Sequence, residues 1–162
     1  MNKQKLTGFV EKYSLGNTIE SVPWSIKSNT LTTEFVSEDR TLLGSVTLNS
    51  FAIDDAEIGI YNTTQLQKMI SVLGSDVTVN LKKADKRAIA IDMTDGDVSL
   101  NYMLADLDII PKAPKLKTLP DTTVVINIDN DFITKFVRAK NALSESDNFT
   151  VISNSITQII IG

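Results

Sequence analysis

Carboxylates form the clearest groups of side chains that could do chemistry in this sequence. They fall into two sets: Asp54, Asp55 and Glu57, and Asp92, Asp95 and Asp97. Paired carboxylates can hold Mg²⁺ or act as a general acid and base. The segment DMTDGD, however, lacks the ligand spacing of a calcium loop, and Asp95-Gly96 is typical of a tight turn between two strands. We therefore expect a hairpin turn there, with no metal ligand and no catalytic residue.

Other common catalytic residues are missing. The chain has no cysteine and no histidine, which excludes disulfides, thiolate metal sites and histidine-dependent catalytic triads. Its 162 residues, of which 42% are hydrophobic and 22% charged, indicate a soluble globular protein. No apolar run approaches the roughly 20 residues of a membrane span, and the N-terminal residues lack the apolar core of a signal peptide. We expect a cytoplasmic protein that uses no cofactor.

Basic residues are concentrated in three windows with helical periodicity, 3–14, 63–73 and 132–143. The apolar stripe of the first window is Leu6, Phe9, Val10 and Tyr13, and that of the second is Leu66, Met69, Ile70 and Leu73. The chain has a formal charge of −4, yet the acidic residues of these windows are limited to Glu11. Their basic residues are Lys3, Lys5, Lys12, Lys68, Lys135, Arg138 and Lys140. Lysines on one helix usually contact only water, but a bias shared by three helices of an acidic chain favours a surface for a polyanion.

The third window has a clear apolar face. A helical wheel groups Phe132, Ile133, Phe136, Val137 and Leu143 on one side. Lys135 and Arg138 fall on the opposite side. Lys140 falls within the apolar stripe, so it would have to extend its ammonium group outward from the helix end.

The remaining segments predict an antiparallel β protein with an internal repeat. Residues 51–61 should form a strand pair, or a strand and a turn, before the second helix. The other predicted strands are 18–22, 24–28, 30–36, 42–48, 76–83, 87–94, 97–104, 122–128, 148–153 and 155–161. The Phe9-Val10 pair of the first helix is echoed by Phe136-Val137 beyond a proline-rich stretch. This predicts a domain at 1–105, a connector at 106–121 and a shorter second domain at 122–162.

This order of elements resembles the DNA polymerase sliding clamps, and within them the clamps of T-even-type bacteriophages. The resemblance extends over the whole chain and depends on the segments GFVEKYS, FAIDDAEIGIYNTTQLQKMISVLG, IIPKAPKLKTLPD and ITKFVRAKNAL. It implies an α+β DNA-clamp fold, with antiparallel sheets outside and amphipathic helices on one face. It also implies one complete domain plus a partial second copy, so that the end of the second domain is missing.

The same resemblance implies a function without enzymatic activity. Such a chain would contribute to a head-to-tail homotrimeric ring that encircles duplex DNA and tethers the replicative DNA polymerase, which gives processivity in phage replication. Its partners would be duplex DNA, the polymerase, a clamp loader and late-transcription factors, in the cytoplasm of an infected bacterial cell and without a membrane.

Site residues follow from the resemblance position by position. The DNA-binding candidates are Lys3, Lys5, Lys12, Lys68, Lys135, Arg138 and Lys140, of which the wheel best supports Lys135 and Arg138. The candidates for binding a partner peptide are Ile109, Ile110, Leu116 and Leu119 in the connector. Two other interpretations stay open: a β-rich, oligomeric phage structural or assembly protein, and a metal-dependent enzyme that uses the carboxylates named above.

Overall fold

The protein is described by a computed structural model at residues 1–85, 87–115, 121, 124–146, 148–153 and 157–161. The chain divides into two compact units, Met1–Lys115 and Leu116–Gly162. The predicted domain boundaries at 105/106 and 121/122 stay a prediction.

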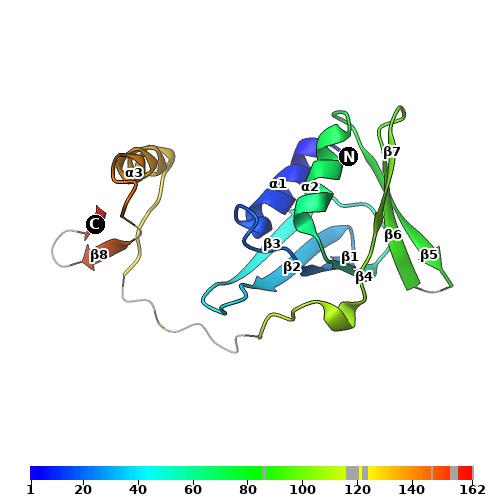
Figure 1. The fold of residues 1–162 in the computed structure, drawn as a ribbon, viewed down its shortest axis with the longest axis horizontal. Helices are drawn as coiled ribbons and strands as arrows, with labels where there is room; N and C mark the ends of the chain where they lie inside the picture. Colours follow the sequence, from blue (N-terminus) through cyan, green and yellow to red (C-terminus); the bar gives the residue numbers. More distant parts are fainter. Residues whose placement is uncertain (86, 116–120, 122–123, 147, 154–156, 162) are drawn as a thin grey trace. The chain divides into compact units, whose positions relative to one another are not determined.

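The first unit contains two antiparallel sheets (Figure 1). The four-stranded sheet has the order β3-β2-β1-β4, and the three-stranded sheet has the order β5-β6-β7. The strands are β1 (Val22–Lys27), β2 (Thr30–Val36), β3 (Leu43–Asn49), β4 (Ala56–Ile60), β5 (Thr78–Ala84), β6 (Arg87–Thr94) and β7 (Ser99–Met103). Residues of β1 alternate between buried and less buried positions, which is the pattern of a strand with one face on a core.

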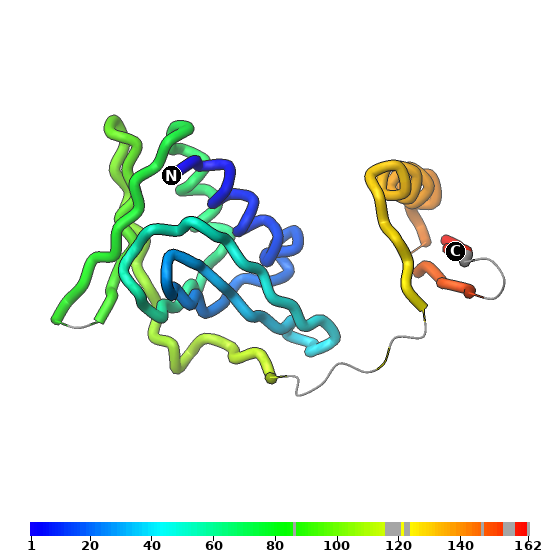
Figure 2. The backbone as a smooth tube through the Cα atoms, turned by 180° about the vertical axis from the view of Figure 1, so that it is seen from behind, coloured from blue at the N-terminus to red at the C-terminus, as the bar shows by residue number. Residues whose placement is uncertain are grey.

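Two helices, α1 (Lys3–Ser14) and α2 (Thr63–Val72), lie side by side on one side of this unit (Figures 1 and 2). Both begin at an asparagine cap. Asn2 Oδ1 accepts a hydrogen bond from Gln4 N at 2.8 Å, and Asn62 Oδ1 accepts one from Gln65 N at 2.7 Å. Such caps satisfy backbone N–H groups that have no partner within the helix.

Aromatic rings from α1 and the four-stranded sheet form the centre of the core. The ring of Trp24 on β1 meets that of Phe9 on α1 edge-on, with 5.5 Å between the ring centroids, and it meets Phe51 at 6.5 Å. Tyr13 is fully buried beside them. The predicted apolar stripe of α1, Leu6, Phe9, Val10 and Tyr13, is buried in full. The first helix was therefore predicted correctly, together with the face that it turns to the core.

Some predicted elements are wrong in this unit. Residues 18–21 form no strand of their own, and Val22 is instead the first residue of β1. Ile19 is buried in the approach to β1, which explains an apolar pattern without a strand. Residues 51–55 form a loop, so the segment 51–61 contains a single strand, β4. Of the two alternatives for this segment, the strand pair is wrong and the single strand with a turn is confirmed. In α2, Leu66 and Ile70 are buried as predicted, and Met69 is only partly buried.

The start of the proline-rich stretch packs against the first unit. Ala105 N donates a hydrogen bond to Gly59 O at 2.9 Å, and a short 3₁₀ helix, η1, follows at Leu107–Ile109. A side chain at Gly59 would meet Ala105 O at 2.7 Å, so this approach requires a glycine. Residues 105–110 therefore pack against the first unit, although the predicted connector begins at residue 106.

The second unit contains α3 (Asn130–Ala142) and a hairpin of β8 (Phe149–Ser153) and β9 (Thr157–Ile161). Both the helix and the hairpin were predicted. The strand predicted at 122–128 is absent from its described residues, 124–128, which have no regular structure. A strand needs the backbone of a neighbouring strand as its hydrogen-bond partner, and β propensity alone does not supply one.

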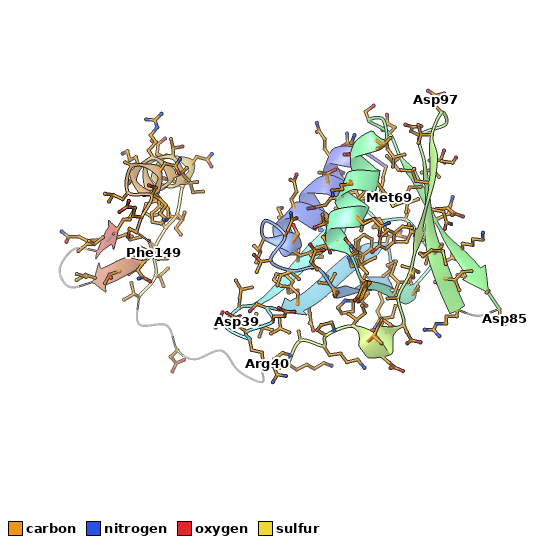
Figure 3. The ribbon with its side chains drawn as sticks, in the orientation of Figure 1. Asp39, Arg40, Met69, Asp85, Asp97 and Phe149 are labelled. Atoms are coloured by element: carbon orange, nitrogen blue, oxygen red, sulfur yellow. The ribbon has the colours of Figure 1, made fainter. Side chains whose placement is uncertain are left out.

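The turn between β6 and β7 is held by a carboxylate (Figure 3 labels Asp97 at its tip). Asp95 accepts hydrogen bonds from Val98 N at 2.7 Å, from Gly74 N at 2.6 Å and from Asp97 N at 2.9 Å. These N–H groups hold the pKa of Asp95 below its usual 3.8. The carboxylate therefore ties this hairpin to the residues just after α2.

Substitution of Asp95 should give a pH-dependent change in stability. Because the pKa of Asp95 is lower in the folded than in the unfolded protein, its ionisation stabilises the fold above pH 3.8, and the effect disappears as the pH falls through the folded-state pKa. Asp95→Asn should lower the Tm at pH 7, and the gap to the unsubstituted protein should shrink on acidification. Thermal unfolding at a series of pH values from 7 to below 3.8 measures this gap in Tm.

The control for this test is Asp97→Asn, because the Asp97 side chain makes no hydrogen bond in the part of the chain that the structure describes. Its Tm should follow that of the unsubstituted protein at every pH. A gap for Asp95→Asn that is equally large at all pH values would contradict the ionic origin of the effect.

Truncation of the aromatic core should be costly. Phe9 is 3% exposed and contacts two other rings, so Phe9→Ala should destabilise the protein by about 3–5 kcal/mol. Urea unfolding followed by the fluorescence of Trp24, the only tryptophan, measures the change. Val72→Ala is the control, since Val72 is 63% exposed and its truncation should cost little. Equal losses for the two variants would refute this assignment of the core.

Candidate nucleic-acid interface

The candidate surface is the outer face of α1 and α2. The two helices are antiparallel: Lys3, at the start of α1, donates to Ser71 O near the end of α2, and Gln67 Nε2 donates to Ser14 Oγ at 3.1 Å. A groove of about 410 Å³ runs between them. Its lining residues are Lys3, Thr7, Glu11, Gln67, Lys68, Ile70 and Ser71. Predicted basic residues from both helices thus meet in one groove.

The start of α2 is fixed by side chains from distant parts of the sequence. Glu20 Oε2 accepts from Thr64 N at 3.0 Å, and Thr64 Oγ1 donates to the same carboxylate. Tyr102 OH accepts from Asn62 N at 3.0 Å and donates to Asn62 O at 3.1 Å. Burial raises the pKa of Tyr102, so its hydroxyl keeps the proton that this pair of hydrogen bonds needs. These hydrogen bonds set the position of α2 beside α1.

Lys3 is not a free surface charge. Its Nζ donates to Ser71 O at 2.9 Å and to Leu73 O at 2.5 Å. These carbonyls belong to the end of α2, where the helix has no further N–H groups to satisfy them and where a positive charge is favourable. Lys3 therefore joins the two helices, a role that its place in the sequence did not reveal.

Three other predicted basic residues of this unit are exposed: Lys5 and Lys12 on α1, and Lys68 on α2. In the described part of the chain, the ion pairs are Lys83–Asp54 at 2.7 Å and Arg87–Asp106 at 2.6 Å, both on other elements. Lys5, Lys12 and Lys68 therefore have no carboxylate partner there, and their charges are available to a phosphate.

The basic residues of α3 divide in the same way. Lys135 and Arg138 are exposed, whereas Lys140 is half-buried and donates to Ser146 O just beyond the helix. The helical wheel thus predicted correctly that Lys135 and Arg138 lie away from the apolar face and that Lys140 lies within it. The helix begins at Asn130 and so includes Asp131 in its first turn, where an acidic residue is favourable.

A second hollow, of about 670 Å³, lies at the start of α2 and was missed in the sequence. It is lined by Glu20, Ser21, Glu38, Tyr61, Asn62, Thr64, Gln65 and Lys68. Lys68 is the residue that it shares with the groove. Glu20 and Thr64 are 44 positions apart, so no local pattern could have predicted this hollow.

The predicted peptide-binding residues that the structure describes differ in exposure. Ile109 is 62% exposed, whereas Ile110 is 3% exposed and packs beside Gly59. Leu116 and Leu119 lie outside the described residues. Ile110 thus contributes to the core of the first unit, and the role of the set in partner binding stays a prediction.

Several of the six candidate metal ligands have other partners. Asp95 binds three backbone N–H groups, Asp54 pairs with Lys83, and Asp55 Oδ1 accepts from Ser28 N at 2.9 Å. Across the residues that the structure describes, no three acidic side chains gather in a group that could hold a metal ion. In the same residues, no helix is long and apolar enough to cross a membrane.

Solved structures with a similar fold include a sliding clamp. A DnaN sliding clamp (DNA polymerase III subunit beta) from Bartonella birtlesii, crystallised with griselimycin, matches with a TM-score of 0.52 and 18% identity over 66% of this chain. DNA polymerase III subunit beta from Pseudomonas aeruginosa matches with a TM-score of 0.51 and 14% identity over 71%.

This chain has the DNA-clamp fold. The structural matches and the sheet topology confirm the predicted α+β class, with antiparallel sheets and amphipathic helices. The chain spans 29% and 31% of the length of the two clamps. No family model matches the sequence, and no curated protein matches it.

Removal of the Lys3 charge should weaken the attachment of the two helices to each other. Lys3→Met keeps most of the aliphatic length but leaves the carbonyls of Ser71 and Leu73 without their donor, so we expect a decrease of about 0.5–1 kcal/mol in the free energy of unfolding. Urea unfolding followed by Trp24 fluorescence measures it. The matched control is Lys5→Met, at an exposed position of the same helix, which should change stability little. The interpretation fails if the two variants are equally stable.

Proposed function

We propose that this chain is a sliding-clamp subunit, or part of one, that holds duplex DNA against its helices without reading the base sequence. The observation that carries the proposal is the α1–α2 pair of a DNA-clamp fold, on which Lys5, Lys12 and Lys68 are exposed without carboxylate partners among the described residues. The wider chain is acidic, so these helices differ in charge from their surroundings.

The proposed mechanism needs no bond-making step. Lysine and arginine ammonium and guanidinium groups attract phosphates irrespective of base sequence, so the protein can exchange one phosphate for the next as it moves along the duplex. Weak attraction is sufficient because a closed ring is retained on DNA by its topology. Lys3 and Lys140 contribute less to this attraction than the other candidates, since their ammonium groups already bind backbone carbonyls.

We also propose that the second unit begins a second clamp domain, with residues 106–121 as the connector. The support is a repeated aromatic pair. Phe9 of α1 meets Trp24 of the following strand edge-on at 5.5 Å, and Phe136 of α3 meets Phe149 of the following strand edge-on at 5.5 Å (Phe149 is labelled in Figure 3). Each helix is followed by an antiparallel hairpin, β1–β2 or β8–β9. In this arrangement, Lys135 and Arg138 would correspond to the DNA-facing charges of the first unit.

The finer assignment follows the sequence resemblance. We propose a clamp of the T-even phage type, which would act as a homotrimeric ring with the replicative polymerase, a clamp loader and late-transcription factors in an infected bacterial cell. Exposed Ile109, together with Leu116 and Leu119, is the proposed binding site for partner peptides, and Ile110 would support it from the core.

Charge reversal on the helices tests the proposal. The triple variant Lys5→Glu, Lys12→Glu and Lys68→Glu should bind a fluorescent duplex of arbitrary sequence more weakly at low salt. For each phosphate that the variant no longer neutralises, the slope of log affinity against log salt should become shallower by about 0.9. Fluorescence anisotropy over a series of NaCl concentrations measures both quantities. Lys135→Glu with Arg138→Glu tests the second unit in the same way.

The control for these variants is Lys27→Glu with Lys82→Glu, which reverses exposed charges on β1 and β5. It should leave the salt slope unchanged. A control that weakens binding as much per charge as the helix variants would show that only net charge matters. Absence of any binding to duplex DNA at low salt would refute the proposed DNA interface.

A further inference from the structure

Glu11 is an unexplained feature of the α1–α2 face. Within these two helices it is the only acidic residue, and it lines the groove together with Lys68. Leu6, Phe9, Val10 and Tyr13 direct the other side of α1 into the core. The next turn of the same helix touches α2 through Ser14 and Gln67. The Glu11 carboxylate is therefore held at the surface where the proposed function requires attraction to phosphate.

Stability does not account for this carboxylate. Glu11 is exposed, and it lies in the C-terminal half of α1, where the helix dipole disfavours a negative charge. The residues three and four positions away, Gly8, Thr7, Ser14 and Leu15, include no basic partner for a helical ion pair. The ion pairs found among the described residues, Lys83–Asp54 and Arg87–Asp106, do not involve it.

We infer that Glu11 tunes the α1–α2 groove to bind duplex DNA weakly. The inference rests on the proposed function and names a residue that regulates the same surface. A phosphate drawn towards Lys68 also approaches the Glu11 carboxylate, since both line one groove, and like charges repel. The groove thus offers a shallow energy minimum to each passing phosphate. A shallow minimum suits a protein that must release each phosphate in order to move along the duplex.

The size of the effect follows from Coulomb's law. At the separations expected across a hydrated groove, two like charges change the affinity for one phosphate by about two-fold to three-fold. The effect should be largest at low ionic strength. It should fade as the Debye length shortens to about 8 Å near physiological salt and to about 3 Å at 1 M.

The test compares Glu11→Gln with Glu34→Gln in the full 162-residue chain. Glu34 is exposed on β2, so its substitution removes the same charge away from the groove. Affinity for a fluorescent duplex of arbitrary sequence is measured by anisotropy over a series of NaCl concentrations. Glu11→Gln should bind about two-fold to three-fold more tightly than the unsubstituted chain at low salt, and this gain should vanish at high salt. Glu34→Gln should bind as the unsubstituted chain does.

A double-mutant cycle with Lys68→Gln locates the effect. If Glu11 acts within the groove, the gain from Glu11→Gln should be smaller in the Lys68→Gln background, because phosphate is no longer drawn to that place. Urea unfolding followed by Trp24 fluorescence shows whether Glu11→Gln is at least as stable as the unsubstituted chain, which the dipole leads us to expect. A gain that is the same in both backgrounds would overturn the assignment to the groove.

Failure of the inference is distinguishable from failure of the proposed function. If the unsubstituted chain binds duplex DNA and the triple lysine variant binds it more weakly, while Glu11→Gln and Glu34→Gln behave alike, the inference is wrong and the DNA interface stands. If neither the unsubstituted chain nor Glu11→Gln binds duplex DNA at low salt, both are wrong.

Discussion

Burial of one side of α1 against the four-stranded sheet is the constraint on which the rest of the first unit depends. Phe9 and Tyr13 surround Trp24 edge-on, so the rotation of α1 about its axis is fixed by aromatic packing. The hydroxyl of Tyr13 lies 3.2 Å from Thr63 Oγ1 in the first turn of α2, which extends the constraint to the second helix. Because the apolar sides of both helices face the core, their polar sides must share one outer surface.

Charged side chains of the same type have different roles in this fold. Lys3 and Lys140 donate to backbone carbonyls at or just beyond helix ends, while Lys68 and Arg138 remain exposed. The carboxylates of Asp95 and Glu20 accept hydrogen bonds from backbone N–H groups, whereas Glu11 has no such partner among the described residues. Charge counts along the sequence therefore overstate the charge available to a ligand, because part of it stabilises the fold.

The fold and the function need separate support in this protein. Identities of 14% and 18% to bacterial clamps establish the arrangement of helices and strands, but a fold can carry many functions. The proposed role depends instead on Lys5, Lys12 and Lys68, which have no carboxylate partner among the described residues. The second unit carries the same helix-and-hairpin order and a comparable aromatic pair, yet its helix has no fully buried residue. Its apolar side chains, among them Ile133 and Val137, are half-exposed.

The sequence by itself determined the three helices, the buried face of α1, most of that of α2 and the Asp95-Gly96 turn, because helical periodicity, caps and turn residues act over a few positions. It also assigned Lys135, Arg138 and Lys140 to exposed and half-buried positions. Only the tertiary structure decided that Lys3 binds the end of α2, that Glu20 fixes its start and that Ile110 is buried, because these interactions join segments 44 to 70 residues apart or depend on a close approach to Gly59. The strand predictions that are wrong, at 18–21 and at the described residues 124–128 of the segment 122–128, have the same cause: strand propensity is local, but the hydrogen-bond partners of a strand come from elsewhere in the fold.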